Sequence, residues 1–149
     1  MQLDELTGQI VDAAYKLHTG LGCGLLESVY ETVLARDLER RGLSVERQKC
    51  LSFDYDGLHF VDCLRIDLLV ESSVIVEIKS AEKLVPQHAK QLLTYLRVTG
   101  LQVGFLINFG EARLQNGLRR VVNGLAPSAS PHLRVNKLSI ATGKAEQRT

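Results

Sequence analysis

The chain has 149 residues, which is enough for one domain with a buried core. Its 45% apolar residues, 23% charged residues and net charge of +1 are typical of a soluble globular protein and do not indicate strong nucleic-acid binding through bulk charge. We expect a cytoplasmic protein, because no window is apolar enough to span a bilayer, the acidic N-terminus is unlike a signal peptide, and three widely spaced cysteines suit reduced, packed thiols.

Two amphipathic helices are expected at the start of the chain. Apolar residues recur at helical spacing over residues 3–18, and a glycine-rich segment from Gly20 ends this helix. A second helix is predicted from about Leu25 to Arg41, with Gly42 as its stop.

Four strands are expected next. An alternating pattern begins at Val45, and Asp56-Gly57 predicts a hairpin turn into a partner strand over residues 58–61. Two further short strands, residues 64–70 and 74–79, are rich in β-branched residues.

The last part of the chain is expected to cross back over the sheet. Pro86 begins a helix that runs to about Val98, and the apolar run 101–109 is typical of an interior strand. Residues 118–122 add one more short element, whereas residues 124–149 are predicted to be a disordered basic tail. The order α-α-β-β-β-β-α-β predicts an α/β (α+β) domain over residues 1–123, with a mixed sheet flanked by helices.

The connection between two of the strands predicts a register. If the three residues 71–73 close a hairpin, Val70 pairs with Val74, and counting outward places Asp67 directly opposite Glu77. The same counting places Arg65 opposite Lys79.

Two carboxylates and an ammonium group are therefore expected on one patch of the sheet. Glu77 and Lys79 lie on the same face because side chains alternate along a strand. Like charges directly opposite each other destabilise a sheet, and a cation such as Mg²⁺, which takes one or two carboxylates, relieves that repulsion. A structural salt-bridge network at a sheet edge is the alternative interpretation.

Two helical faces carry further candidate residues. Glu27 begins the second helix and Tyr30 lies one turn later, although a helix-dipole role for Glu27 and core packing for Tyr30 are open alternatives. His88, Gln91 and Tyr95 share one face of the third predicted helix, which is also compatible with an ordinary polar surface.

Several motifs at matching spacing resemble those of the GxxExxY proteins, a family placed in the PD-(D/E)XK nuclease-like superfamily. The resemblance covers roughly residues 5–123. The matching motifs are Gly24-Leu-Leu-Glu27-Ser-Val-Tyr30, Tyr55-Asp-Gly57, Arg65-Ile-Asp67, Val76-Glu77-Ile-Lys79, Gln91-Leu-Leu-Thr-Tyr95 and Leu106-Ile-Asn108-Phe109. It implies an α-β-β-β-α-β core with an added N-terminal helix.

The resemblance also implies roles for individual residues. Asp67 is similar to the motif aspartate, Glu77 and Lys79 resemble the (D/E)XK pair, and Glu27 resembles an acid that joins the metal shell. By the same analogy, the backbone carbonyl of Ile78 supplies another ligand to Mg²⁺ or Mn²⁺.

The candidate substrate-binding residues are Tyr30, Arg65, His88, Gln91 and Tyr95. Of these, Gln91 and Tyr95 resemble a QxxxY motif that lies near the nuclease site. The leading hypothesis is a metal-dependent nuclease that hydrolyses phosphodiester bonds, of DNA in preference to RNA. A catalytically silent module that binds nucleic acid or a protein partner is the first alternative, and a structural or regulatory dimer is the second.

Overall fold

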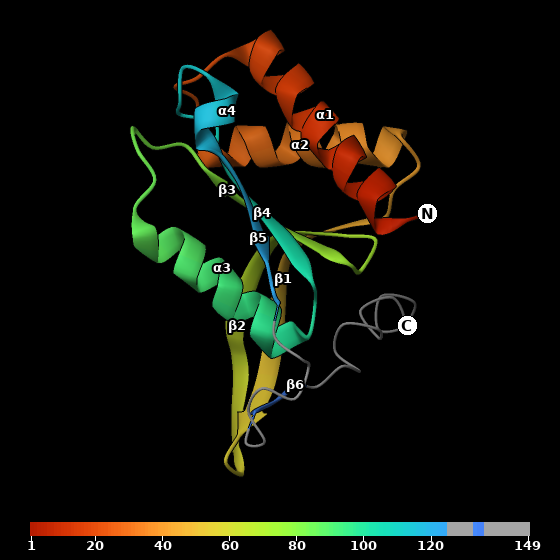
Figure 1. The fold of residues 1–149 in the computed structure, drawn as a ribbon, viewed down its shortest axis with the longest axis vertical. Helices are drawn as coiled ribbons and strands as arrows, with labels where there is room; N and C mark the ends of the chain where they lie inside the picture. The colour runs from red at the N-terminus through yellow and green to blue at the C-terminus, as the bar shows by residue number, and fades with distance from the viewer. Residues whose placement is uncertain (125–132, 136–149) are drawn as a thin grey trace.

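The computed structural model describes residues 1–124 and 133–135, which form a mixed sheet with helices on both faces (Figure 1). The strand order in this sheet is β5-β4-β3-β2-β1-β6. In chain order the elements are α1 (Leu3–Leu21), α2 (Glu27–Arg40), β1 (Val45–Tyr55), β2 (Leu58–Val70), β3 (Val74–Lys79), α3 (Pro86–Thr99), β4 (Val103–Asn108), α4 (Leu114–Gly117), β5 (Leu118–Val122) and β6 (Leu133–Val135).

The strand pairing follows from the lengths of the connections. Short turns join β1 to β2 and β2 to β3, and both pairs are antiparallel. The longer connection through α3 returns the chain in the same direction, so β4 pairs parallel with β3. β5 then pairs antiparallel with β4. The predicted α-β-β-β-α-β core, with an additional helix at the N-terminus, is therefore present.

The two faces of the sheet are covered by different helices, and each face has its own apolar core. Val74, Val76 and Ile78 of β3 belong to the core that also contains the buried side chains of α1 and α2. Ile75, one position out of step, belongs to the core under Leu92 and Leu96 of α3. The period-two alternation of a strand thus separates the two cores.

The helix and strand that follow β3 agree with the sequence prediction. Pro86 occupies the first turn of α3, and Gly100 ends the helix in a left-handed conformation with a φ of 73°. Every residue of β4 is buried, as expected for a strand covered on both faces. Among the described residues, none of the helices has both the length and the apolar character needed to cross a membrane.

The hairpin of β1 and β2 differs from the prediction. Asp56 and Gly57 form the expected turn with φ values of 50° and 76°. The two short strands predicted at 58–61 and 64–70 are, however, one continuous strand. Exposure explains the error, because most side chains from Leu58 to Cys63 face solvent and carry no alternating pattern.

The chain after Val122 departs from the prediction of a disordered tail in one segment. Residues 133–135 form β6 and pair antiparallel with residues 53–55 of β1. Residues 125–132 and 136–149, on which the rest of that prediction falls, lie outside the described part of the chain. The cysteine prediction was also partly wrong, because all three thiols are free but exposed instead of packed.

Candidate active site

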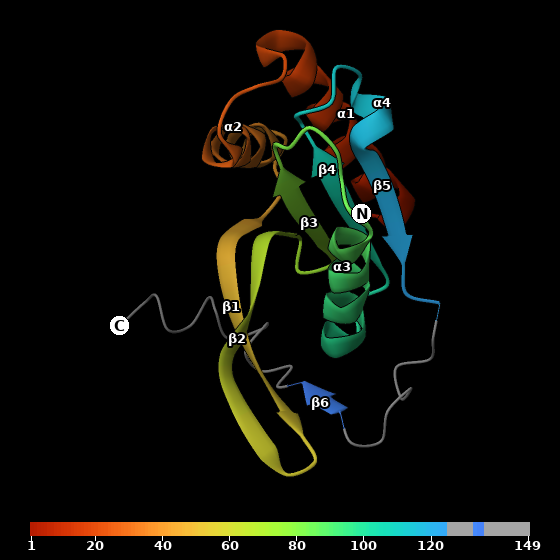
Figure 2. The ribbon, with the colours of Figure 1, turned by 90° about the vertical axis from the view of Figure 1, so that its left-hand side faces the viewer.

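The candidate site lies where β2 and β3 separate. The loop after β2 pairs Val70 with Val74, as predicted, and the ladder continues only to Leu68 and Val76. Asp67 and Glu77 are the next residues on the two strands. Beyond this point the β1–β2 hairpin extends away from the rest of the sheet (Figure 2). Arg65 and Lys79 lie beyond the end of this ladder, so the predicted pairing of these two residues was wrong, because the strands separate before they reach it.

Each of the two carboxylates accepts a hydrogen bond from a backbone N–H of the other residue's strand. The backbone N–H of Asp67 donates a hydrogen bond to Oε1 of Glu77 at 3.3 Å. In return, the backbone N–H of Ile78 donates to Oδ2 of Asp67 at 2.8 Å. The carboxylates therefore take backbone donors at the point where the two strands stop pairing with each other. This contact confirms that Asp67 and Glu77 lie together.

Burial makes this carboxylate pair electrostatically unfavourable. Glu77 is 6% exposed, and its burial, with the nearby charge of Asp67, raises its pKa to about 8. The charge of Lys79 acts in the opposite direction but is the weaker influence. A pair in this state is relieved either by a proton on Glu77 or by a cation between the two groups.

A pocket of about 820 Å³ opens beside this pair at the N-terminus of α2. Its lining residues are Leu25, Leu26, Glu27, Ser28, Glu31, Gln48, Arg65, Asp67, Ile78 and Ser80. The lining combines carboxylates with an arginine, so it offers ligands for a cation and a donor for a phosphate.

Glu27 lines the pocket without completing a set of three acids. Its Oε1 accepts a hydrogen bond from the backbone N–H of Ser80 at 3.4 Å. Within residues 1–124 and 133–135, no three histidine, cysteine, aspartate or glutamate side chains converge closely enough to hold a metal ion. Mg²⁺ is commonly held by one or two carboxylates and otherwise by water, so Asp67 and Glu77 fit such an ion without Glu27.

The predicted face of α3 contributes one residue close to the acids. Burial raises the pKa of Tyr95, a backbone hydrogen bond at Arg65 lowers it, and the nearby charges of Glu77 and Asp67 raise it further. Gln91 is exposed one turn earlier. Nδ1 of His88 accepts a hydrogen bond from the backbone N–H of Val85 at 3.3 Å, at the first turn of α3.

Tyr30 is buried in the core, whereas a substrate-binding role requires an accessible side chain. It is fully buried and stacks on Phe109, with ring centroids 4.6 Å apart. Its hydroxyl donates to the carbonyl of Gly22 at 2.7 Å and accepts from the backbone N–H of Leu25 at 3.2 Å. Tyr30 thus belongs to the core and holds the loop that leads into Glu27, so the core-packing alternative describes it better.

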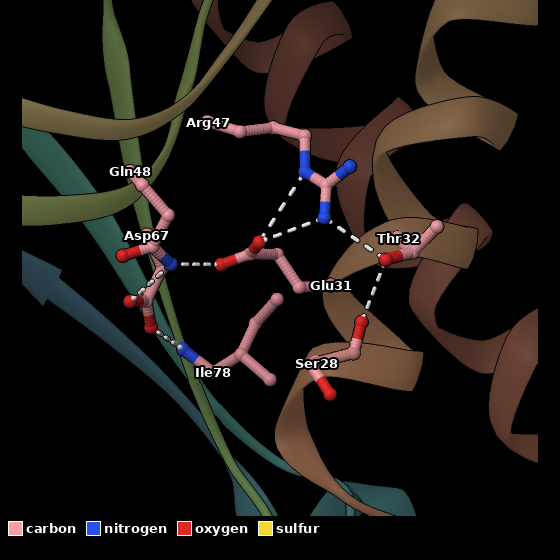
Figure 3. Close-up of polar contacts among 7 residues, drawn as sticks. All are labelled: Ser28, Glu31, Thr32, Arg47, Gln48, Asp67 and Ile78. Carbon is pink, nitrogen blue, oxygen red and sulfur yellow. Dashed lines mark hydrogen bonds and ion pairs between the residues drawn. The ribbon is translucent and has the colours of Figure 1, made fainter.

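The structure adds two residues to the pocket that the sequence did not indicate. Nε2 of Gln48 donates to Oδ1 of Asp67 at 3.3 Å and also to Oε1 of Glu31 (Figure 3). Glu31, only 7% exposed, is bound on its other oxygen by Arg47 at 3.0 Å. Its spacing from Glu27, one helical turn, was an available signal.

Comparison with known proteins gives one match. A family model described as the PD-(D/E)XK nuclease superfamily matches residues 4–121. This confirms the superfamily and the fold that the motifs implied, and it concerns the superfamily, not the GxxExxY family within it. No curated protein and no solved structure matches the chain.

Proposed function

Because the chain belongs to the PD-(D/E)XK nuclease superfamily, we propose that it is a nuclease that hydrolyses phosphodiester bonds of DNA with Mg²⁺ or Mn²⁺. The observation that carries this proposal is the contact between Asp67 and Glu77 at the edge of an open pocket. A buried glutamate whose pKa is raised beside a second carboxylate is a costly arrangement for a purely structural element, whereas it suits a site that receives a cation.

The metal would be held by the carboxylates of Asp67 and Glu77 together with the backbone carbonyl of Ile78. When bound, the ion supplies positive charge against a phosphate oxygen and increases the acidity of an attacking water. The half-buried Asp67 lines the pocket, and Glu77 lies behind it at the end of the strand ladder.

Lys79 and Glu27 would handle protons and water. Lys79 follows Glu77 on the same face of β3, so its ammonium group can orient the water and oppose the negative charge that develops on the phosphate. Glu27 is exposed on the α2 side of the pocket, where it can accept a hydrogen bond from that water.

Arg65 and α3 would position the substrate. The exposed Arg65 lines the pocket, and a guanidinium group binds phosphate oxygens with a fixed pair of donors. Tyr95 lies near the carboxylates, and Gln91 and His88 extend the same face of α3 toward its N-terminus. A nucleic-acid strand between the β1–β2 hairpin and α3 would contact all four residues.

The test is cleavage of supercoiled plasmid and of single-stranded DNA in Mn²⁺, with the wild type compared to Asp67→Ala and Lys79→Ala. Loss of a metal ligand or of a proton-handling group lowers the rate by about 100-fold or more. Each variant is therefore expected to lose nearly all cleavage while keeping the circular dichroism spectrum of the wild type.

Matched controls come from α1, on the opposite side of the molecule from α3. Asp4→Ala and Lys16→Ala remove the same charges from exposed positions and are expected to leave cleavage within about twofold of the wild type. Cleavage that survives both Asp67→Ala and Lys79→Ala would exclude the assignment. A wild type that binds Mn²⁺ but cuts no nucleic acid would favour the catalytically silent module.

A further inference from the structure

A glutamine in an unusual backbone conformation lies next to the proposed metal ligands. The β1–β2 register pairs Arg47 with Leu68 and Lys49 with Ile66, which leaves Gln48 level with Asp67. Gln48 has a φ of 49°, in the left-handed region that residues other than glycine seldom adopt. Such a conformation persists where the surrounding structure holds it in place.

The side chain of Gln48 bridges two carboxylates. Its Nε2 donates to Oε1 of Glu31 and to Oδ1 of Asp67 at 3.3 Å (Figure 3). Ionised carboxylates only accept hydrogen bonds, so the amide nitrogen, with its two protons, must be the atom that faces them. One amide group thus ties β2 to α2 across the pocket.

The far end of this bridge is itself fixed. Oε2 of Glu31 accepts from Nε and Nη2 of Arg47 at 3.2 and 3.0 Å. Nη2 of Arg47 also donates to Oγ1 of Thr32 at 2.9 Å. Glu31 therefore has one oxygen bound to a cation and the other to Gln48, and its side chain cannot change conformation without breaking these contacts.

The near end fixes the orientation of Asp67. Gln48 holds Oδ1, and the backbone N–H of Ile78 holds Oδ2 at 2.8 Å, so rotation of the carboxylate about its terminal bond is blocked at both oxygens. Each oxygen still has a free lone pair, because a carboxylate offers about four acceptor positions. Partners of this kind set the direction in which a carboxylate presents its remaining lone pairs to a metal.

We propose that Gln48, anchored by Glu31 and Arg47, is a positioning residue that orients Asp67 for metal binding. The inference rests on the proposed function, since it concerns the same ligand. It assigns Gln48 no contact with substrate, and it explains why an amide side chain is held in a left-handed backbone conformation at this point of β1.

The sharpest test is Gln48→Gly, because glycine suits a φ of 49° while it removes the amide. The variant is expected to unfold at a temperature close to that of the wild type in EDTA. Its affinity for Mn²⁺, measured from the electron paramagnetic resonance signal of the free ion, should fall about 10- to 100-fold, the usual effect of losing a partner of a metal ligand.

Ser72→Gly is the matched control, since Ser72 has a φ of 50° in the loop between β2 and β3. It makes the same kind of backbone change and is expected to leave Mn²⁺ affinity unchanged. A comparable loss of affinity in Ser72→Gly, or an affinity within twofold of the wild type in Gln48→Gly, would overturn the inference.

A double-mutant comparison tests the anchoring by Glu31. Glu31→Leu should weaken Mn²⁺ binding in the same direction, and Gln48→Gly combined with Glu31→Leu should lose no more affinity than Gln48→Gly alone. Additive losses would show that Glu31 does not act through Gln48. Wild-type protein that fails to bind Mn²⁺ would remove the proposed function itself, whereas normal wild-type binding with an unaffected Gln48→Gly would remove only this inference.

Discussion

Two polar clusters of this molecule are built from similar residues and differ in their charge balance. Between α1 and α2, Arg41 contacts Asp12 at 2.8 Å, Asp37 at 3.1 Å and Gln9 at 2.8 Å. Lys16 also contacts Asp37 at 3.3 Å, so two cations face two acids. At the end of the β2–β3 ladder, Asp67 and Glu77 contact each other, and the nearby charge of Lys79 only partly offsets their repulsion.

The charge balance determines what each cluster is suited to do. The Arg41 cluster pairs its acids with cations, so it connects two helices at little electrostatic cost. The cluster at Asp67 and Glu77 would hold excess negative charge, on a buried Glu77, if both acids were ionised, so it favours binding of a proton or of a cation. The first cluster should behave as a structural contact and the second as a receptor for a cation.

The largest expected effect is a dependence of stability on pH that comes from Glu77 and not from the Arg41 cluster. The folded-state pKa of Glu77, about 8, lies above its ordinary value of 4.5, so the folded protein holds this proton more tightly than the unfolded chain does. Its contribution to stability is present below pH 4.5 and is lost as pH rises through 8. Glu77→Gln removes this loss, so in EDTA it should be more stable than the wild type at pH 9 by roughly 5 kcal/mol.

Urea denaturation at pH 5 and pH 9 measures this difference directly. At pH 5 the two proteins should differ by about 1 kcal/mol or less, since the wild-type carboxyl is then protonated in the folded state. Glu5→Gln, at an exposed position of α1, is the control and should change stability equally at both pH values. A Glu77→Gln variant with the same stability difference at pH 5 and pH 9 would show that Glu77 is ionised normally.

The next effect is the response to the cation itself. At pH 7, binding of Mg²⁺ or Mn²⁺ should release close to one proton from Glu77, because the metal needs the ionised carboxylate. Free metal at 100 times its Kd should stabilise the wild type by about 2.7 kcal/mol. Calorimetry in buffers of different ionisation enthalpy measures the proton, and thermal unfolding measures the stabilisation.

Two observations would contradict the expected response to metal. Proton release that is as large at pH 9 as at pH 7 would mean that the proton comes from another group, since Glu77 should be ionised at the higher pH. Equal stabilisation of the wild type and of Glu77→Gln by metal would place the cation elsewhere. Either result would remove the functional contrast between the two clusters.

The sequence predicted the Asp67–Glu77 cluster and the mixed sheet, and the reason is local. Asp67 and Glu77 were predictable because three connecting residues set the register of β2 against β3, and the count from Val70 and Val74 then places the acids together. The mixed sheet was predictable for a similar reason, since turns and a helical crossover dictate the direction of each strand.

Other parts of the site depend on tertiary packing that no local pattern encodes. Tyr30 has the spacing of a site residue, but its ring is directed into the core against Phe109, and a helical repeat does not distinguish these environments. Gln48 contacts Asp67 from a left-handed backbone position on β1, and it contacts Glu31 because α2 packs beside this strand. The strand β6 has only three residues and lies far from β1 in the sequence, so composition alone indicated a tail.

The smallest expected effect comes from the Arg41 cluster. Arg41→Met keeps much of the aliphatic packing and removes the contacts to Asp12 and Asp37, so it should destabilise the protein by about 1 kcal/mol, less at high salt. Arg40→Met, at an exposed position one residue earlier, is the matched control. Because aspartate and arginine both stay ionised from pH 6 to pH 9, the loss should be the same at both values and in the presence or absence of Mg²⁺. A loss that grows with pH or disappears when metal is added would mean that α1 and α2 sense the charge state of the pocket, and the two clusters would then be one coupled system.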